Sequence, residues 1–198
     1  YTPGLGYYSA NNAKFGFKGD FVTAPEISTL FGRTLARQAI QLFRQLGQTS
    51  ILEFGAGSGK LAFDLLTELK QFDQLPMQYL ILEISAELQQ RQRSLFETHA
   101  PQLLNRITWL TELPEQFSGL IIANEVLDAM PTHLIVWKKD ELFERGVSID
   151  QQAFTWSDKP LINNELLAIA SQLSTLIDRN EVNFVSYLSE ISLANRYF

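Results

Sequence analysis

The stretch Ile51-Leu52-Glu53-Phe54-Gly55-Ala56-Gly57-Ser58-Gly59-Lys60 decides the fold class of this chain of 198 residues. Residues 51–54 of this stretch, together with the preceding Ser50, have the length and apolar character of a buried strand. Alternating glycines follow, and leucines at helical spacing come next. A strand, a glycine turn and a helix in this order present backbone N–H groups and a helix N-terminus to a ligand. The stretch predicts a nucleotide-type site; a tight turn without a ligand is the alternative.

The glycine spacing distinguishes the nucleotide classes that use such a turn. A phosphate-binding P-loop requires G-x-x-x-x-G-K-[ST], but Phe54 stands at the first glycine position and Leu61 at the hydroxyl position. A dinucleotide site requires G-x-G-x-x-G, whereas Gly55, Gly57 and Gly59 are spaced G-x-G-x-G. The P-loop is therefore rejected, and the dinucleotide site fits poorly.

Two acidic residues favour a cationic ligand. Glu53 lies inside the strand, where a carboxylate is costly to bury without a partner, so it either faces a cation or fixes the turn. S-adenosylmethionine carries a sulfonium and an ammonium but no phosphate, which favours it over NAD or ATP. Glu83 ends the next strand, about 24 residues after Gly59, where a carboxylate holds ribose hydroxyls in related α/β domains. An exposed acid at a strand end is the alternative for Glu83.

A helix is expected to precede this unit. Thr23 and Glu26 have the spacing of a capping box, and Pro25 suits the first helical turn. Apolar residues continue at helical spacing, and Gly47 is a typical C-terminal stop. The sequence therefore predicts one helix from Thr23 to Gly47.

The pattern after the glycine turn alternates between strands and helices. A helix capped by Ser85 is expected to run to about His99 and to stop before Pro101. Further strands are expected at residues 79–82, 107–110 and 120–123. This alternation implies a Rossmann-like α/β fold with a mostly parallel sheet and right-handed crossovers.

After Pro131 the pattern changes to an antiparallel insertion. We expect strands at residues 133–137, 142–149 and 154–156, with Lys139 and Asp140 in the first turn, and a helix over 161–178. Residues 182–188 are expected to form a further strand or an extended segment. Trp137, Trp156 and Phe143 are expected to form a satellite core; an exposed aromatic patch for a protein partner is the alternative. The domain organisation is thus an N-terminal arm over 1–22, a Rossmann-like core over 23–131, and the insertion with its helix over 132–198.

Composition excludes several classes of site. Hydrophobic residues make up 45% and charged residues 19%, which is globular composition. Cysteine is absent and the only histidines, His99 and His133, are far apart, so no metal site is expected. The net charge is -6 without a basic cluster, which argues against nucleic acid. No apolar run is long enough for a membrane span.

Several motifs resemble the MidA-like family of S-adenosylmethionine-dependent methyltransferases. They are Gly6-Tyr7-Tyr8, the block 19–28 with Phe31-Gly32, the turn block 53–59, the block 124–131, and Glu190-Ile191-Ser192. The family includes a mitochondrial protein arginine methyltransferase that helps to assemble respiratory complex I. The resemblance implies a seven-stranded methyltransferase sheet and methyl transfer to a protein arginine. Because family members continue well beyond the Glu190 element, we expect the sheet to be incomplete at its C-terminal end.

The cofactor residues follow from the turn and from the family blocks. We expect S-adenosylmethionine to be held by Glu53, Gly55, Ala56, Gly57, Ser58, Gly59, Glu83, Asn124, Thr23 and Glu26.

Three further acids are candidates for catalysis. Glu125 and Asp128 follow the fourth strand, at the edge where open α/β sheets bind ligands. Three positions apart, they would share one helical face and grip an arginine; solvent-facing acids near a helix cap are the alternative. Asp20 is expected to contact cofactor or substrate, and its alternative is a turn aspartate that bonds its own backbone.

The expected function is an S-adenosylmethionine-dependent methyltransferase that acts on arginine of a protein substrate. The alternative is an assembly factor or protein-binding module that does not turn the cofactor over, and a small-molecule methyltransferase is a third option. A homodimer is compatible with either role. The resemblance implies the mitochondrial matrix for a eukaryotic source and the cytoplasm for a bacterial one.

Overall fold

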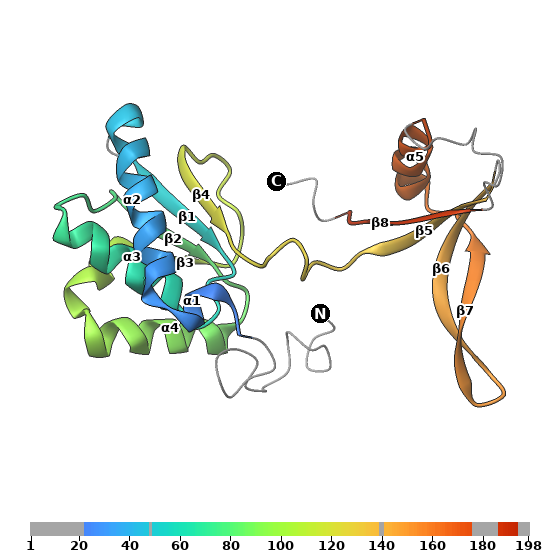
Figure 1. The fold of residues 1–198 in the computed structure, drawn as a ribbon, viewed down its shortest axis with the longest axis horizontal. Helices are drawn as coiled ribbons and strands as arrows, with labels where there is room; N and C mark the ends of the chain where they lie inside the picture. Colours follow the sequence, from blue (N-terminus) through green and yellow to red (C-terminus); the bar gives the residue numbers. More distant parts are fainter. Residues whose placement is uncertain (1–21, 48, 139–140, 176–185, 194–198) are drawn as a thin grey trace. The chain divides into compact units, whose positions relative to one another are not determined.

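The computed structural model describes residues 22–47, 49–138, 141–175 and 186–193. The chain divides into two compact units, Tyr1–Asp128 and Ala129–Phe198 (Figure 1). The first unit holds a parallel sheet with helices, and the second holds an antiparallel sheet with one helix. Within the part of the chain that the structure describes, no helix combines the length and apolar character needed to cross a bilayer.

The parallel sheet of the first unit confirms the predicted fold class. Its strands are β1 (Ser50–Phe54), β2 (Tyr79–Leu82), β3 (Ile107–Leu110) and β4 (Gly119–Ala123), in the order β3-β2-β1-β4. Phe54 of β1 pairs with Leu82 on one side and with Ala123 on the other. The carboxyl ends of β1, β2 and β4 therefore meet at one sheet edge. The four described strands are fewer than the seven that the resemblance implies.

The helix before β1 differs from the prediction because the chain bends at Ser28. Helix α1 (Ala24–Ile27) ends there, and α2 (Thr29–Leu46) begins directly after it. Ser28 has φ -155° and ψ 140°, and its hydroxyl accepts a hydrogen bond from the Leu30 N–H at 3.1 Å. Gly47 follows α2 with φ +80°, as expected for a helix stop.

The predicted capping box at α1 is wrong. The Thr23 side chain makes no capping hydrogen bond, and the Glu26 carboxylate accepts from the Ser58 hydroxyl in the glycine turn. Glu26 thus bonds to a residue outside its own helix, in place of the backbone N–H of Thr23 that a capping box requires.

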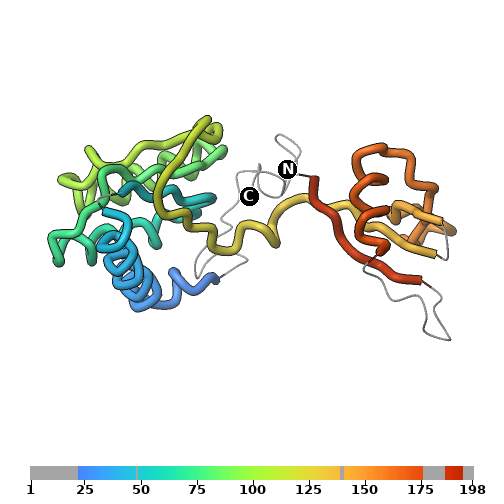
Figure 2. Tube along the Cα trace, turned by 90° about the horizontal axis from the view of Figure 1, so that it is seen from above, coloured from blue at the N-terminus to red at the C-terminus, as the bar shows by residue number. Residues whose placement is uncertain are grey.

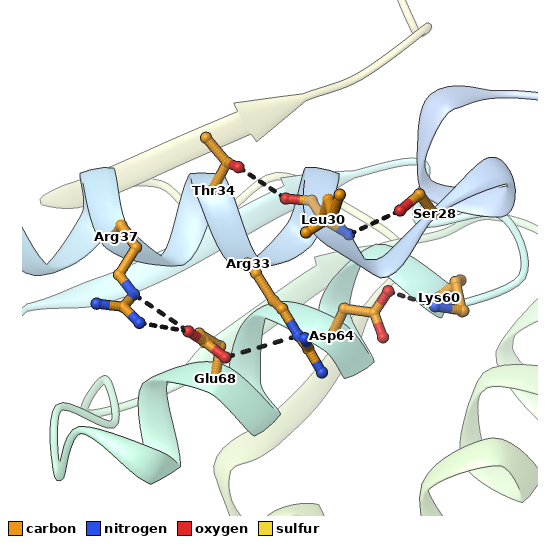
Figure 3. A network of polar contacts seen from close by, with 8 residues as sticks. All are labelled: Ser28, Leu30, Arg33, Thr34, Arg37, Lys60, Asp64 and Glu68. Carbon is orange, nitrogen blue, oxygen red and sulfur yellow. Dashed lines mark hydrogen bonds and ion pairs between the residues drawn. The ribbon is translucent and has the colours of Figure 1, made fainter.

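Helices α2 and α3 (Lys60–Gln71) pack closely, and they share apolar and ionic contacts. The apolar part includes Ala36, Ala39, Leu65, Leu66 and Leu69, all fully buried. Figure 3 shows the ionic part, in which Arg33 and Arg37 of α2 reach the buried Glu68 of α3 at 3.7 and 3.1 Å. Helix α4 (Ala86–His99) and the 3-10 helix η1 (Pro101–Arg106) complete the unit, and Ser85 caps α4 as predicted.

Gly32 of α2 lies where the two helices approach most closely, and this position supports a prediction. A Cβ atom at Gly32 would lie 2.7 Å from Cβ of Asp64 on α3. Gly32→Ala is therefore expected to lower the free energy of unfolding by about 1–3 kcal/mol in a urea titration, because overpacking must shift both helices. Gly146→Ala is the matched control, since a Cβ there meets nothing within 4 Å. Equal unfolding midpoints for the two variants would contradict the close approach.

The second unit is an antiparallel sheet with the order β7-β6-β5-β8. Its elements are β5 (His133–Lys138), β6 (Glu141–Asp150), β7 (Ala153–Pro160), α5 (Asn164–Leu173) and β8 (Tyr187–Ile191). Strand β8 lies beside β5, with His133 opposite Ile191, although the two are far apart in sequence (Figure 2). The expected turn at 139–140 and parts of the expected segments 161–178 and 182–188 lie outside the described residues.

The predicted satellite core is right for Trp137 and wrong for Trp156. Trp137 is buried, and its indole N–H donates to the Ala170 carbonyl of α5 at 3.1 Å. Phe143 is half-buried beneath the Lys138 ammonium. Trp156 is 62% exposed and Phe154 is 84% exposed. They lie on the part of the β6–β7 hairpin that extends beyond the pairing of β5 with residues 141–145, where β6 and β7 pair only with each other among the described strands.

Candidate cofactor site

The glycine turn after β1 has the backbone that the sequence predicted. Gly55, Gly57 and Gly59 have φ of +60°, +55° and +83°, a region that side chains rarely adopt. The Gly59 N–H donates to the Ala56 carbonyl at 2.8 Å, and Gly59 then precedes the first residue of α3. The turn therefore depends on glycine for its conformation, and it brings the N-terminus of α3 to the carboxyl edge of the sheet.

Ser58 connects this turn to α1. Its hydroxyl donates to the Glu26 carboxylate and accepts from the Lys60 N–H at 3.2 Å. The Lys60 ammonium pairs with Asp64 one helical turn further on. The lysine beside the turn thus has a carboxylate partner within its own helix, which agrees with the rejection of a P-loop.

Glu53 lies beneath the turn and has a specific partner. It is 2% exposed, and the Tyr79 hydroxyl of β2 donates to its Oε2 at 2.8 Å. Burial raises the pKa of Glu53 to about 7; the Tyr79 hydrogen bond opposes this effect, and the nearby Glu83 charge adds to it. Burial and the Glu53 carboxylate likewise raise the pKa of Tyr79. The site therefore contains a carboxyl group that changes charge near neutral pH.

Glu83, at the carboxyl end of β2, is buried, so the alternative of an exposed strand-end acid is wrong. It is 6% exposed, and its Oε1 accepts from the Ser85 N–H at 3.0 Å. Its Oε2 accepts from the side-chain amide of Gln92 at 3.4 Å. These two contacts, one on each carboxylate oxygen, fix the direction of Glu83 at the carboxyl end of β2. Ile84, which follows, is 72% exposed and offers an apolar surface at the same edge.

The segment after β4 differs from the prediction. Residues 124–130 form bends and a turn, so Glu125 and Asp128 do not share a helical face. Glu125 has φ +54°, an unusual value for a residue with a side chain. A Cβ at Gly55 would meet the Val126 side chain at 3.5 Å, so this segment packs against the glycine turn. Bends and a left-handed backbone at Glu125 thus replace the expected helical conformation.

The remaining predicted residues are placed as follows. Asn124 is half-buried, whereas Glu125 and Asp128 are exposed. Thr23 is half-buried at the start of α1. Asp20 lies outside the described residues. The structure thus brings the turn, Glu26, Glu53, Glu83 and the segment after β4 to one sheet edge.

Gln92 of α4 is a residue of this site that the sequence reasoning missed. Its side chain is fully buried, and its amide donates to the Gly57 carbonyl at 2.9 Å. The available signal was a polar residue between Leu88 and Phe96, which are four positions away on either side and share its helical face.

Comparisons with known proteins agree with this geometry. The family described as "Putative S-adenosyl-L-methionine-dependent methyltransferase" matches residues 34–198. The mitochondrial protein arginine methyltransferase NDUFAF7 homolog of Drosophila melanogaster is 32% identical over 155 residues, or 67% of this chain and 35% of that protein. The Danio rerio protein arginine methyltransferase NDUFAF7, also mitochondrial, is 28% identical and is matched over 91% of this chain and 47% of its own length.

A solved structure extends the comparison to the fold. A Burkholderia thailandensis protein bound to S-adenosyl-homocysteine is 44% identical and superposes with a TM-score of 0.79, over 96% of this chain and 49% of that one. This chain therefore spans about half or less of the length of these relatives. The family match confirms the predicted cofactor type, S-adenosylmethionine. The glycine turn, the buried acids around it and these matches together show that the chain belongs to the MidA-like family of S-adenosylmethionine-dependent methyltransferases.

Proposed function

We propose that this chain binds S-adenosylmethionine at the glycine turn and transfers its methyl group to an arginine of a protein substrate. The observation that carries the proposal is the turn itself, with three left-handed glycines above the buried Glu53 and beside the buried Glu83. These acids suit a ligand with a sulfonium and an ammonium, and the lysine beside the turn is paired with Asp64. The names of the fly and zebrafish relatives support arginine as the acceptor.

The chemistry requires orientation of two reactants more than activation by the protein. When bound, S-adenosylmethionine would supply an electrophilic methyl group to a guanidinium nitrogen of the acceptor. The acceptor would release one proton to water, and the products would be S-adenosylhomocysteine and methylarginine. In this proposal Glu83 holds the ribose, Glu26 and Ser58 orient the turn, and Glu125 and Asp128 hold the guanidinium. Asp20 and Thr23 are proposed as further contacts of the two ligands.

Calorimetry on this chain tests the cofactor half of the proposal. S-adenosylhomocysteine is expected to bind, and NAD is expected not to bind, because the turn lacks the spacing of a dinucleotide site. Binding of NAD with equal or higher affinity would contradict the proposal.

A variant of Asp128 tests the acceptor half. Asp128→Asn is expected to reduce labelled methyl transfer to protein by about tenfold or more, since a charge-assisted bond to the acceptor is lost. Its affinity for S-adenosylhomocysteine should stay unchanged, because Asp128 is exposed beyond the turn. Glu115→Gln, which removes another exposed acid, is the control.

Failure of any protein to accept label, despite confirmed cofactor binding, would contradict arginine transfer by this chain. That result would favour the alternative of a protein-binding module that does not turn the cofactor over. The exposed apolar pairs Val147–Trp156 and Ile149–Phe154 of the β6–β7 hairpin are the surface that supports this alternative. The proposed compartment is the mitochondrial matrix for a eukaryotic source and the cytoplasm for a bacterial one. The names of the fly and zebrafish relatives, which say that both are mitochondrial, support the first.

A further inference from the structure

Gln92 is a fully buried amide that joins three elements of the first unit. From α4, its Nε2 donates to the Gly57 carbonyl in the glycine turn at 2.9 Å and to Glu83 Oε2 at the end of β2 at 3.4 Å. Its Oε1 accepts from the indole N–H of Trp109 on β3 at 2.8 Å. Both donors and the acceptor of the amide therefore have protein partners.

Trp109 determines which way the amide points. An indole N–H can only donate, so the amide oxygen must face Trp109 and the amide nitrogen must face Gly57 and Glu83. The Arg93 guanidinium stacks on the Trp109 ring at 3.9 Å and holds the indole in place. The orientation of Gln92 is thus set by a chain of contacts that begins at the surface of α4.

Packing fixes the position of Gln92 as well as its orientation. A Cβ at Gly59 would lie 3.0 Å from Cγ of Gln92 and 3.4 Å from its Cα. The turn and α4 are therefore in direct contact, and the absence of a side chain at Gly59 makes this contact possible. If the amide moved away from the turn, the Gly57 carbonyl would lose the hydrogen bond that Gln92 donates.

We propose that Gln92 is a positioning residue of the cofactor site, whose amide fixes the distance and direction of the Glu83 carboxylate relative to the glycine turn. This inference rests on the proposed cofactor site. Gln92 acts through Glu83 and Gly57, which are the groups expected to meet the ligand. Because the amide donates to one Glu83 oxygen and the Ser85 N–H donates to the other, the direction of the Glu83 carboxylate is fixed from both sides. A carboxylate held in this way suits the pair of hydroxyls of a ribose.

Three variants of α4 separate the positioning role from helix packing. Gln92→Met keeps the length of the side chain but removes the amide, and Gln92→Glu keeps the acceptor for Trp109 but removes the donors. Gln90→Glu adds the same charge at an exposed position of the same helix. In calorimetry at about pH 8, both Gln92 variants are expected to bind S-adenosylhomocysteine about tenfold or more weakly. Gln90→Glu is expected to match the wild type.

A pH series provides the readout that loss of packing would not change. Three charged groups are linked to position 92: Glu83 on β2, which Gln92 contacts directly; Glu53 on β1, which senses the Glu83 charge; and Arg93 on α4, which stacks on Trp109. Once protonated, the carboxyl group that Gln92→Glu introduces can donate to Glu83 again. This variant should therefore regain affinity relative to the wild type as the pH falls to about 6. Gln92→Met has no such proton and should not recover.

The outcomes of this experiment are distinct. Recovery of the glutamate variant alone supports the positioning role. Wild-type affinity in both Gln92 variants, or an equal loss that no pH restores, would overturn it. If Gln92→Glu does not fold, wild-type affinity of Gln92→Met would overturn the inference and weakened binding by the folded Met variant would support it. If the folded wild-type chain itself binds no S-adenosylhomocysteine, the proposed cofactor site fails, which is a different result.

Discussion

Replacing Glu53 by glutamine is expected to raise the free energy of unfolding at about pH 8 by on the order of 3 kcal/mol. Burial raises the pKa of Glu53 from 4.5 in the unfolded chain to about 7 in the folded protein. Between these values the folded protein holds a proton that the unfolded chain has released. The contribution of this group to stability therefore falls as the pH rises from about 4.5 to about 7, and it is constant above and below.

Glutamine has the shape of the protonated acid and can still accept the Tyr79 hydrogen bond, so it does not incur the cost of a buried charge. The stability difference between Glu53→Gln and the wild type should be small near pH 4.5 and reach its maximum above about pH 7. Urea titrations over this range measure it, with Glu112→Gln as the control for an exposed acid. A difference that does not vary with pH would contradict the buried titration of Glu53.

The same variant should bind its cofactor less well. If the ionised Glu53 faces the cationic part of the ligand, glutamine weakens the binding of S-adenosylmethionine more than that of S-adenosylhomocysteine, because the latter lacks the sulfonium charge. Stability and affinity would then change in opposite directions, as expected for a residue kept for function at a cost in stability. Equal losses of affinity for both ligands would show that Glu53 fixes the conformation of the turn and does not face the sulfonium.

Replacing Gly59 by alanine is expected to weaken binding of S-adenosylhomocysteine by about tenfold to a hundredfold. The left-handed backbone, with φ +83°, costs an alanine about 1–2 kcal/mol. The new Cβ would also press on Gln92 at 3.0 Å. Relief of either strain moves the turn relative to Glu83, so the site loses its geometry.

Gly47→Ala is the matched control for this effect. Gly47 also has a positive φ, +80°, although its ψ is -170° where Gly59 has 2°, and a Cβ there meets nothing within 4 Å. Both variants should lose stability in urea titrations because both place a side chain at a positive φ, and only Gly59→Ala should lose affinity in calorimetry. Equal affinities in the two variants would show that the turn is not the cofactor site.

Much of the first unit could be predicted because its signals are local. The strand, the glycines and the helix of residues 50–71 follow from neighbouring residues, since apolar runs, positive φ values and helical spacing are properties of short segments. The same holds for the strands at 79–82 and 107–110 and for the Ser85 cap. Glu53 and Glu83 indicated the cofactor, and the family motifs, which span the chain in one order, added the expected methyl acceptor.

The side-chain contacts of the cofactor site could not be predicted in this way, because they join residues that are distant in the sequence. Glu26 and Ser58 are 32 positions apart, Glu53 and Tyr79 are 26 apart, and Gln92 and Gly57 are 35 apart. No local pattern reveals which buried donor meets which acceptor, so the capping box and the helix after β4 were predicted wrongly and Gln92 was missed.

The sequence by itself determined that a glycine turn opens the α/β unit and that acids, without a phosphate-binding lysine, surround it. Only the tertiary structure decided how those acids are held: Glu53 by Tyr79, Glu83 by Gln92 and Ser85. The physical reason is that backbone conformation follows from local sterics. The charge and direction of a buried carboxylate depend instead on burial and on hydrogen-bond donors that folding brings from other strands and helices.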